Sequence, residues 1–246
     1  MHSEDFTLTS DGLNIAAQAH WPDHAAQAPG LIVLHGFGSC KENHAALAAE
    51  AASRGWVAVC FDFRGHGASD GCLDSHTIHD VGAALAWLQA QPGVDPARIA
   101  VRGSSMGGYF AIHALRRWPE LACGVALNPP DEAGLNRLMR DARDPTTFFG
   151  EWRARGEGFP RLMGCDLACW LESSDVYTAA AERAPRPLLL IHCRGDEMVP
   201  VEITERLCAA ACEPKTCWLL EGGDHRFASH DPDVRARMLD WLAAAI

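Results

Sequence analysis

The segment Gly103-Ser104-Ser105-Met106-Gly107 has the form Gly-x-Ser-x-Gly and lies between a strand-like run, Arg98 to Arg102, and a helix-like run, Met106 to Trp118. A strand-to-helix turn of this form presents a serine hydroxyl at the edge of a sheet. The helix that follows directs backbone N–H groups and the positive end of its dipole toward that serine. We therefore predict that Ser105 is a nucleophile. The plainer interpretation is a glycine-rich turn without chemistry.

A serine hydroxyl needs a base at neutral pH, and a histidine oriented by a carboxylate supplies one. Asp196 follows the strand-like run Pro187 to Cys193, and His225 follows the strand-like run Lys215 to Leu220. The order serine, acid, histidine is the one that accompanies this type of turn. If the strands are parallel, all three side chains lie at one edge of the sheet. We predict that Asp196 is the acid and His225 the base.

Three neighbouring residues are alternatives for these roles. Glu197 adjoins Asp196 and Asp224 adjoins His225, but adjacent side chains point in different directions, and we favour Asp196 as the acid. His230 is the alternative base. Two other histidines, His35 and His66, follow strand-like runs in tight turns, where we expect them to hydrogen-bond loop backbone.

An acyl-transfer reaction also needs an oxyanion hole, in which backbone N–H groups stabilise the developing negative charge. One N–H should come from Met106, the residue after the nucleophile. The other should come from the loop His35-Gly36-Phe37-Gly38, after the apolar run Leu31 to Leu34. We predict Phe37 as this second donor, with a side chain placed to line the pocket. A simple glycine turn is the alternative.

The elements around these loops alternate between strand-like and helix-like runs, which predicts an α/β fold with a mostly parallel sheet covered by helices on both faces. Residues Phe6 to His20 are typical of an antiparallel hairpin. Residues 129–184 break the alternation, with Pro129-Pro130, a charged helix-like piece and several aromatic residues. This segment is too long for a simple connection. We predict a core of residues 1–128 and 185–246 and an inserted cap of residues 129–184.

Taken together, these motifs resemble the α/β-hydrolase superfamily over nearly the whole chain. The closer resemblance is to the carboxylesterases of the cinnamoyl/feruloyl esterase and monoglyceride lipase-like group. Much of it lies in Asp62-Phe-Arg-Gly-His-Gly-Ala-Ser-Asp-Gly71, a string expected to be structural. The resemblance does not extend clearly into residues 129–184, which we expect to select the substrate. It implies the same triad and oxyanion donors: Ser105, Asp196, His225, Phe37 and Met106.

Charge and hydropathy limit the partners of the chain. The formal net charge of −11 over 246 residues disfavours nucleic acid and anionic membranes. No uncharged apolar run reaches the roughly 18 to 20 residues of a membrane helix. Residues Met1 to Ile15 lack the pattern of a secretory signal. We expect a cytoplasmic protein with no nucleic-acid partner and no membrane span, and a homodimer is compatible with the sequence.

Ten cysteines are present, of which Cys60, Cys123 and Cys193 lie in apolar runs and are expected to be buried as small hydrophobic residues. The groups Cys165-x3-Cys169 and Cys208-x3-Cys212-x4-Cys217 lack the Cys-x-x-Cys spacing and nearby histidines of zinc sites. We predict free thiols, rank zinc second, rank a structural disulfide last, and expect no bound metal.

The predicted activity is hydrolysis of small carboxylic esters through an acyl-enzyme intermediate, without a cofactor. The same triad serves thioesterases and small-peptide peptidases. A non-catalytic ligand-binding protein of this fold is the alternative from another class. A thioesterase for coenzyme A esters needs basic residues near the mouth of the site, and the basic residues that keep this alternative open are Arg137, Arg140, Arg143, Arg153, Arg155 and Arg161. Acidic residues that a peptidase could use to hold a substrate amine are Glu151, Glu157 and Glu172.

Overall fold

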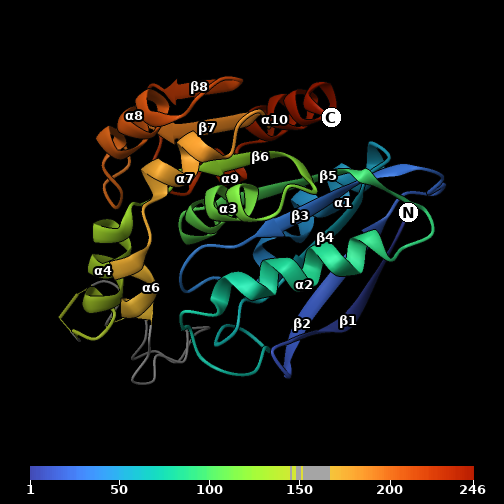
Figure 1. The fold of residues 1–246 in the computed structure, drawn as a ribbon, viewed down its shortest axis with the longest axis horizontal. Coiled ribbons are helices and arrows are strands. Elements are labelled where there is room, and N and C mark those ends of the chain that lie inside the picture. The colour runs from blue at the N-terminus through green and yellow to red at the C-terminus, as the bar shows by residue number, and fades with distance from the viewer. Residues whose placement is uncertain (145, 148–150, 152–166) are drawn as a thin grey trace.

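The computed structural model describes residues 1–144, 146, 147, 151 and 167–246. Within them, strands form a single sheet and helices cover both of its faces (Figure 1). The strands are β1 (His2–Ser10), β2 (Leu13–Trp21), β3 (Ala28–Leu34), β4 (Val57–Phe61), β5 (Val94–Ser104), β6 (Leu121–Leu127), β7 (Leu188–Cys193) and β8 (Lys215–Leu220). The helices are η1 (Lys41–His44), α1 (Ala45–Ser53), α2 (Thr77–Gln89), α3 (Met106–Arg117), α4 (Glu132–Asp141), α6 (Leu167–Ser173), α7 (Val176–Glu182), α8 (Val201–Ala210), α9 (Phe227–His230) and α10 (Pro232–Ala245).

The strand order is β1-β2-β4-β3-β5-β6-β7-β8. The strands from β3 to β8 pair in parallel, whereas β1 and β2 form an antiparallel hairpin that joins the sheet at β4. The predicted fold class and the predicted hairpin are therefore confirmed. Because the ends of parallel strands meet at one edge, the loops after β5, β6, β7 and β8 lie beside one another.

Alternation along the strands divides the core into two layers. In β3, Ile32 and Leu34 pack on the face covered by α2, α3, α7 and α8. Leu31 and Val33 pack on the opposite face, under α1 and α10. A strand that is buried on both faces shows a continuous apolar run, and Leu31 to Leu34 is such a run. No helix among the described residues is long and apolar enough to cross a membrane.

The described part of residues 129–184 forms α4, α6 and α7, of which α4 and α6 are hydrogen-bonded to α3, the helix that follows Ser105. The Tyr109 hydroxyl of α3 donates to Glu132 Oε1 of α4 at 3.0 Å, and Trp170 Nε1 of α6 donates to Tyr109 at 3.0 Å. The N–H of Val176, at the start of α7, reaches the same Glu132 oxygen. Residues outside the described part include Phe148, Phe149, Trp152, Arg153, Arg155, Glu157, Phe159 and Arg161.

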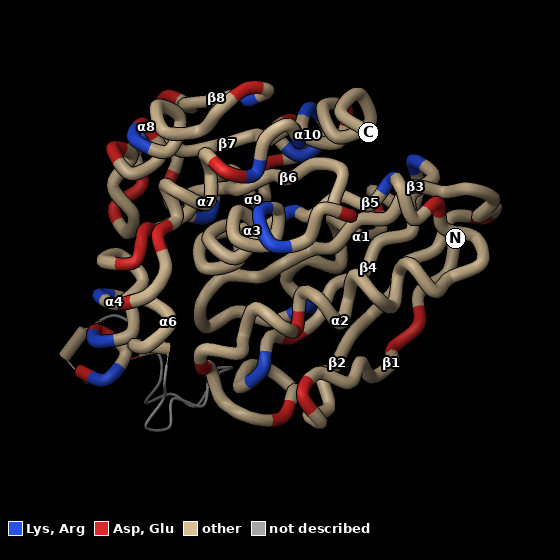
Figure 2. Tube along the Cα trace, viewed as in Figure 1, with Lys and Arg blue, Asp and Glu red and all other residues tan. Residues whose placement is uncertain are grey.

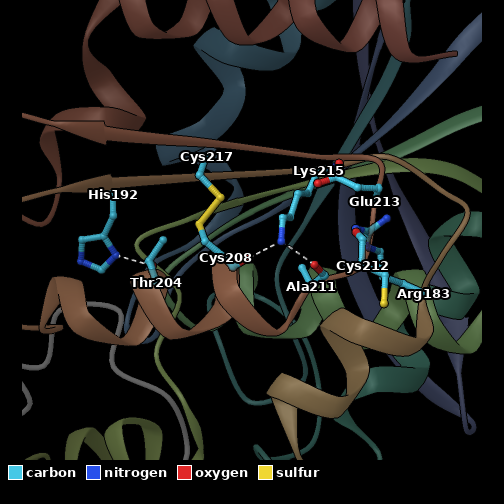
Figure 3. The surroundings of a disulfide bond; sticks show 9 residues. All are labelled: Arg183, His192, Thr204, Cys208, Ala211, Cys212, Glu213, Lys215 and Cys217. Carbon is cyan, nitrogen blue, oxygen red and sulfur yellow. Dashed lines mark hydrogen bonds between the residues drawn. A yellow bond between two sulfur atoms is a disulfide. The ribbon is translucent and has the colours of Figure 1, made fainter.

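The low rank given to a disulfide is wrong for one pair of cysteines. Cys208 in the last turn of α8 is bonded to Cys217 in β8 (Figure 3). The chain reverses between Ala211 and Lys215, so two residues nine apart in sequence come to a Cα–Cα distance of 6.4 Å, which a disulfide spans. The x3 and x4 spacings do not reveal this reversal.

The remaining described cysteines are free thiols, and Cys60, Cys123 and Cys193 are buried, as predicted. Among described residues, no cluster of histidine, cysteine and carboxylate side chains has the geometry of a metal site. Cys165 lies outside the described part of the chain.

Candidate active site

Ser105 sits at the sharp turn between β5 and α3, with a φ of 54° and a ψ of −122°. This positive φ is strained for a residue with a side chain and is typical of functional turns. The two flanking glycines are required sterically. A Cβ on Gly103 would lie 1.9 Å from the Gly107 carbonyl oxygen, and one on Gly107 would lie 2.5 Å from that of Leu34. The Gly-x-Ser-x-Gly spacing is therefore a packing requirement of this turn.

The loop after β3 lies directly against Ser105. A Cβ on Gly36 would meet the Ser105 Cβ at 3.2 Å, so the backbone of Gly36 passes beside the serine. Phe37 follows in that loop, and Met106 begins α3 on the other side of Ser105. Both residues are buried. The Phe37 ring packs against His66, and Phe37 does not line the cavity beside His225 that is described below.

The loops after β7 and β8 bring Asp196 and His225 together. His225 Nδ1 lies 2.6 Å from Asp196 Oδ2, and the carboxylate is fully buried. Burial by itself raises the pKa of Asp196, but the hydrogen bond and charge of His225 and the N–H groups of Val199 and Met198 outweigh it and lower this pKa. The carboxylate therefore remains ionised at neutral pH, where it fixes the imidazole with its proton on Nδ1 and Nε2 free to accept one.

Ser105 and His225 are linked through hydrogen bonds that Leu127 and Asn128 make to their backbones. Among the hydrogen bonds of the described residues, none joins the Ser105 hydroxyl to the imidazole. The Ser105 N–H donates to Leu127 O at 2.8 Å, and the side chain of Asn128 donates to His225 O at 2.8 Å. Nucleophile–base hydrogen bonds commonly tighten only when substrate binds.

The alternative acids and base have other surroundings. Glu197 lines a cavity beside His225 instead of bonding to it. Asp224 Oδ1 accepts the N–H groups of Arg226 and Phe227, which closes the turn around His225. His230 is exposed at the end of α9. Of the three candidate carboxylates, the one that bonds to His225 is Asp196.

The two histidines expected to hold loop backbone make such contacts. His35 Nε2 accepts the Phe63 N–H at 2.9 Å, so Nδ1 carries the proton and donates to Gly36 O at 2.7 Å. His66 Nδ1 lies 3.3 Å from Arg64 O. These bonds brace the loop that carries Phe37.

The string Asp62–Gly71 also makes structural contacts. Asp62 accepts the N–H groups of Lys41 and Ala68, and the buried Arg64 forms an ion pair with buried Asp80 at 2.7 Å. These contacts fix the loop after β4 beside the loop after β3. They support the positioning of the site and place no further reactive group in it.

A cavity of about 670 Å³ opens beside His225. Its walls come from α4, from the loop after β7 and from the loop after β8, and Figure 2 shows that α4 carries charges of both signs. The lining residues are Arg137, Leu138, Asp141, Thr147, Glu197, Met198, Pro200, Asp224, His225 and Arg226. Such a mixed lining suits a small neutral or polar molecule better than a strongly charged one.

Asn128 is the residue of the site that sequence reasoning missed. It is buried, has a φ of 46° and donates a hydrogen bond from its side chain to the backbone carbonyl of His225. The available signal was an asparagine at the end of a strand, before Pro129-Pro130. Asparagine tolerates a positive φ, but this signal does not reveal the partner of the side chain.

Comparison with known proteins identifies the family of this chain. Residues 31–238 match the model of the Alpha/beta hydrolase family. An uncharacterized protein of Mycobacterium tuberculosis, Rv2307c, is 28% identical over 227 residues, which are 92% of this chain and 72% of that protein. The alpha/beta hydrolase GrgF from a Penicillium species superposes with a TM-score of 0.82 at 20% identity, covering 100% of this chain and 99% of the other. The esterase domain of a Rhodothermus marinus protein gives 0.75 at 25% identity, covering 99% and 97%. The chain therefore belongs to the alpha/beta hydrolase family.

Proposed function

We propose that this protein is a serine hydrolase that cleaves carboxylic esters, with Ser105 as nucleophile, His225 as base and Asp196 as the orienting acid. The observation that carries the proposal is the 2.6 Å contact between Asp196 and His225, at the sheet edge where the strained Ser105 turn also lies. The likeness to an esterase domain from Rhodothermus marinus supports the ester substrate.

In the proposed reaction, Ser105 Oγ attacks the ester carbonyl carbon while His225 Nε2 takes the hydroxyl proton. The N–H groups of Phe37 and Met106 stabilise the resulting oxyanion. The carbon–oxygen bond to the alcohol then breaks, and the alcohol leaves with the proton from His225. Water gives a proton to His225 and attacks the acyl-enzyme, which frees the acid and restores the Ser105 hydroxyl.

Residues 129–184 are proposed as the cap that selects the substrate. Support comes from α4, whose Arg137, Leu138 and Asp141 form one wall of the cavity beside His225. The resemblance of the sequence to feruloyl esterases and monoglyceride lipase-like enzymes leads us to propose esters with an aryl or apolar acyl group as substrates.

A fluorophosphonate probe tests whether Ser105 is the nucleophile. The wild-type protein should become covalently labelled, and Ser105→Ala should abolish both labelling and ester turnover. Ser104→Ala is the matched control, since Ser104 adjoins the nucleophile but directs its hydroxyl to Ser229 at 2.7 Å; it should still be labelled. Absence of labelling in folded wild-type protein would favour the non-catalytic, ligand-binding alternative.

Substrate comparison then separates the three enzymatic possibilities. The proposal expects turnover of p-nitrophenyl esters with a preference among chain lengths, and of methyl ferulate if the narrower likeness holds. Higher kcat/KM on acyl-coenzyme A would assign a thioesterase instead. Higher kcat/KM on aminoacyl-p-nitroanilides would assign a peptidase.

A further inference from the structure

Asn128 lies between the chain segments that carry the three residues of the proposed triad. Its neighbour Leu127 accepts the Ser105 N–H at 2.8 Å, as the last residue of β6. The Asn128 amide nitrogen Nδ2 donates to His225 O at 2.8 Å. Its amide oxygen Oδ1 accepts the N–H of Cys193 at 3.2 Å, at the end of the strand that leads to Asp196. Two successive residues of β6 and its loop therefore contact the nucleophile, the base and the strand of the acid.

The orientation of the amide is fixed by the chemistry of its partners. A carbonyl oxygen only accepts hydrogen bonds and an N–H only donates them, so the amide can satisfy His225 O and the Cys193 N–H in one orientation alone. Asn128 is 1% exposed, so water does not replace these contacts. Its own N–H donates to Ile191 O at 2.8 Å, which anchors the backbone from which the side chain projects.

The loop that carries His225 needs such an external anchor. It contains Gly222 and Gly223 in succession, with φ values of 74° and 77°, and glycine restricts the chain less than any other residue. Asp224 closes the turn from within the loop, while the contact of Asn128 falls on the backbone of His225 itself. A shift of the His225 carbonyl moves the imidazole relative to both Asp196 and Ser105.

We infer that Asn128 is a positioning residue that sets the imidazole of His225 through its backbone carbonyl and couples it to the strand of Asp196. The inference rests on the proposed function for its kinetic consequence, but the hydrogen-bond geometry it assigns to His225 is independent of substrate. The two hydrogen bonds of the Asn128 side chain go to the backbone of His225 and of Cys193, so its effect passes through these two residues.

Two substitutions separate the hydrogen bond made by the amide nitrogen of Asn128 from the one made by its amide oxygen. Asn128→Asp keeps the acceptor for the Cys193 N–H and loses the donor to His225 O, with little change of shape. Asn128→Gly removes both side-chain hydrogen bonds, and glycine adopts the positive φ without strain. Ile78→Val is the matched control, because it trims a buried side chain of α2, a helix that packs mainly against β1, β5 and α3, and tests whether lost stability alone lowers activity.

The kinetic test measures kcat and KM on a p-nitrophenyl ester for each variant. Both Asn128 variants should lower kcat about tenfold or more, with KM within about twofold of wild type, since misplacing a catalytic group by less than 1 Å is enough for such a loss. Ile78→Val should keep the wild-type kcat. A wild-type kcat in Asn128→Asp would overturn the inference, and a loss confined to Asn128→Gly would assign Asn128 to holding β7 instead.

A readout without substrate distinguishes this inference from the proposed function. The Nδ1 proton of His225, bonded to Asp196, gives a downfield proton resonance that His225→Asn removes. In both Asn128 variants this proton should exchange with water at least about tenfold faster, because the imidazole–carboxylate contact opens more often. Unchanged exchange in folded Asn128→Asp would overturn the inference. If wild-type protein lacks esterase activity, the proposed function fails while the exchange rates still decide the role of Asn128.

Discussion

Two histidines share the neighbourhood of the Asp196 carboxylate but have different roles. His225 Nδ1 lies 2.6 Å from Oδ2, whereas His192 Nε2 lies 3.5 Å from the same oxygen. His192 Nε2 is also 3.0 Å from Val199 O, which can only accept, so the proton of His192 is on Nε2. Its Nδ1 then accepts the Thr204 hydroxyl at 2.6 Å. His192 thus braces the loop after β7, and His225 is the histidine to which we assign proton transfer in the proposed mechanism.

Replacement of Asp196 tests the orienting role at the scale of one residue. Asp196→Asn should lower kcat roughly 10³- to 10⁴-fold, since an amide cannot stabilise the imidazolium and permits the wrong tautomer of His225. Steady-state turnover of a p-nitrophenyl ester measures this loss. Glu197→Gln is the matched control, because Glu197 is the next residue and lines the cavity. If Glu197→Gln causes the larger loss in kcat, Glu197 rather than Asp196 is the acid that orients His225.

The disulfide acts at the scale of elements, because it joins α8 to β8 directly. These elements adjoin the loops of Asp196 and His225, respectively. Lys215 Nζ donates to the carbonyl oxygens of Cys208 and Ala211 at 2.6 and 2.7 Å, and thus satisfies the C-terminal end of α8 (Figure 3). Helix and strand are therefore held by a covalent bond and by a cation at the helix end, where a positive charge is favourable.

Removal of this disulfide should destabilise the fold more than it affects catalysis. For two cysteines nine residues apart, loop-closure entropy gives about 2–3 kcal/mol in the free energy of unfolding. We expect Cys208→Ser/Cys217→Ser to lose about this much in urea unfolding and to keep kcat, because Lys215 still holds α8. Cys212→Ser, which removes an exposed free thiol from the same turn, should be close to neutral. A double variant as stable as wild type would contradict the role given to the disulfide.

At the scale of the whole molecule, the sheet and its loops were predictable because their signals are local. Apolar runs such as Leu31 to Leu34 predict buried strands, and parallel strands place the residues that follow them at one edge. That rule, together with the order serine, acid, histidine along the chain, predicted that Asp196 and His225 would lie together. Cys208 with Cys217, and Asn128 with His225, depend on where the chain reverses or on what faces one side chain. These contacts were not predictable from one sequence.

Buried histidines give the whole fold a pH dependence that no single element determines. Burial lowers the pKa of His35, His44 and His192, and Arg102 adds to this for His44, whose Nδ1 accepts a hydrogen bond from that guanidinium. Each is neutral in the folded protein near neutral pH, whereas the unfolded chain takes up a proton near pH 6.5. Folding stability is then fully present above pH 6.5 and is lost as the pH falls below it.

Urea unfolding at pH 7.5 and pH 5.5 measures this effect. The free energy of unfolding should be lower at pH 5.5 than at pH 7.5, because the unfolded chain takes up protons on these histidines that the folded protein does not. The carboxylates with lowered pKa, such as Asp196 and Glu42, contribute only at lower pH, where the unfolded chain begins to protonate them. His44→Gln, which keeps an acceptor for Arg102, should reduce the pH dependence. Val81→Ala, which weakens the core without removing a titrating group, should keep all of it. Equal stability of wild-type protein at the two pH values would contradict the neutral, buried state assigned to these histidines.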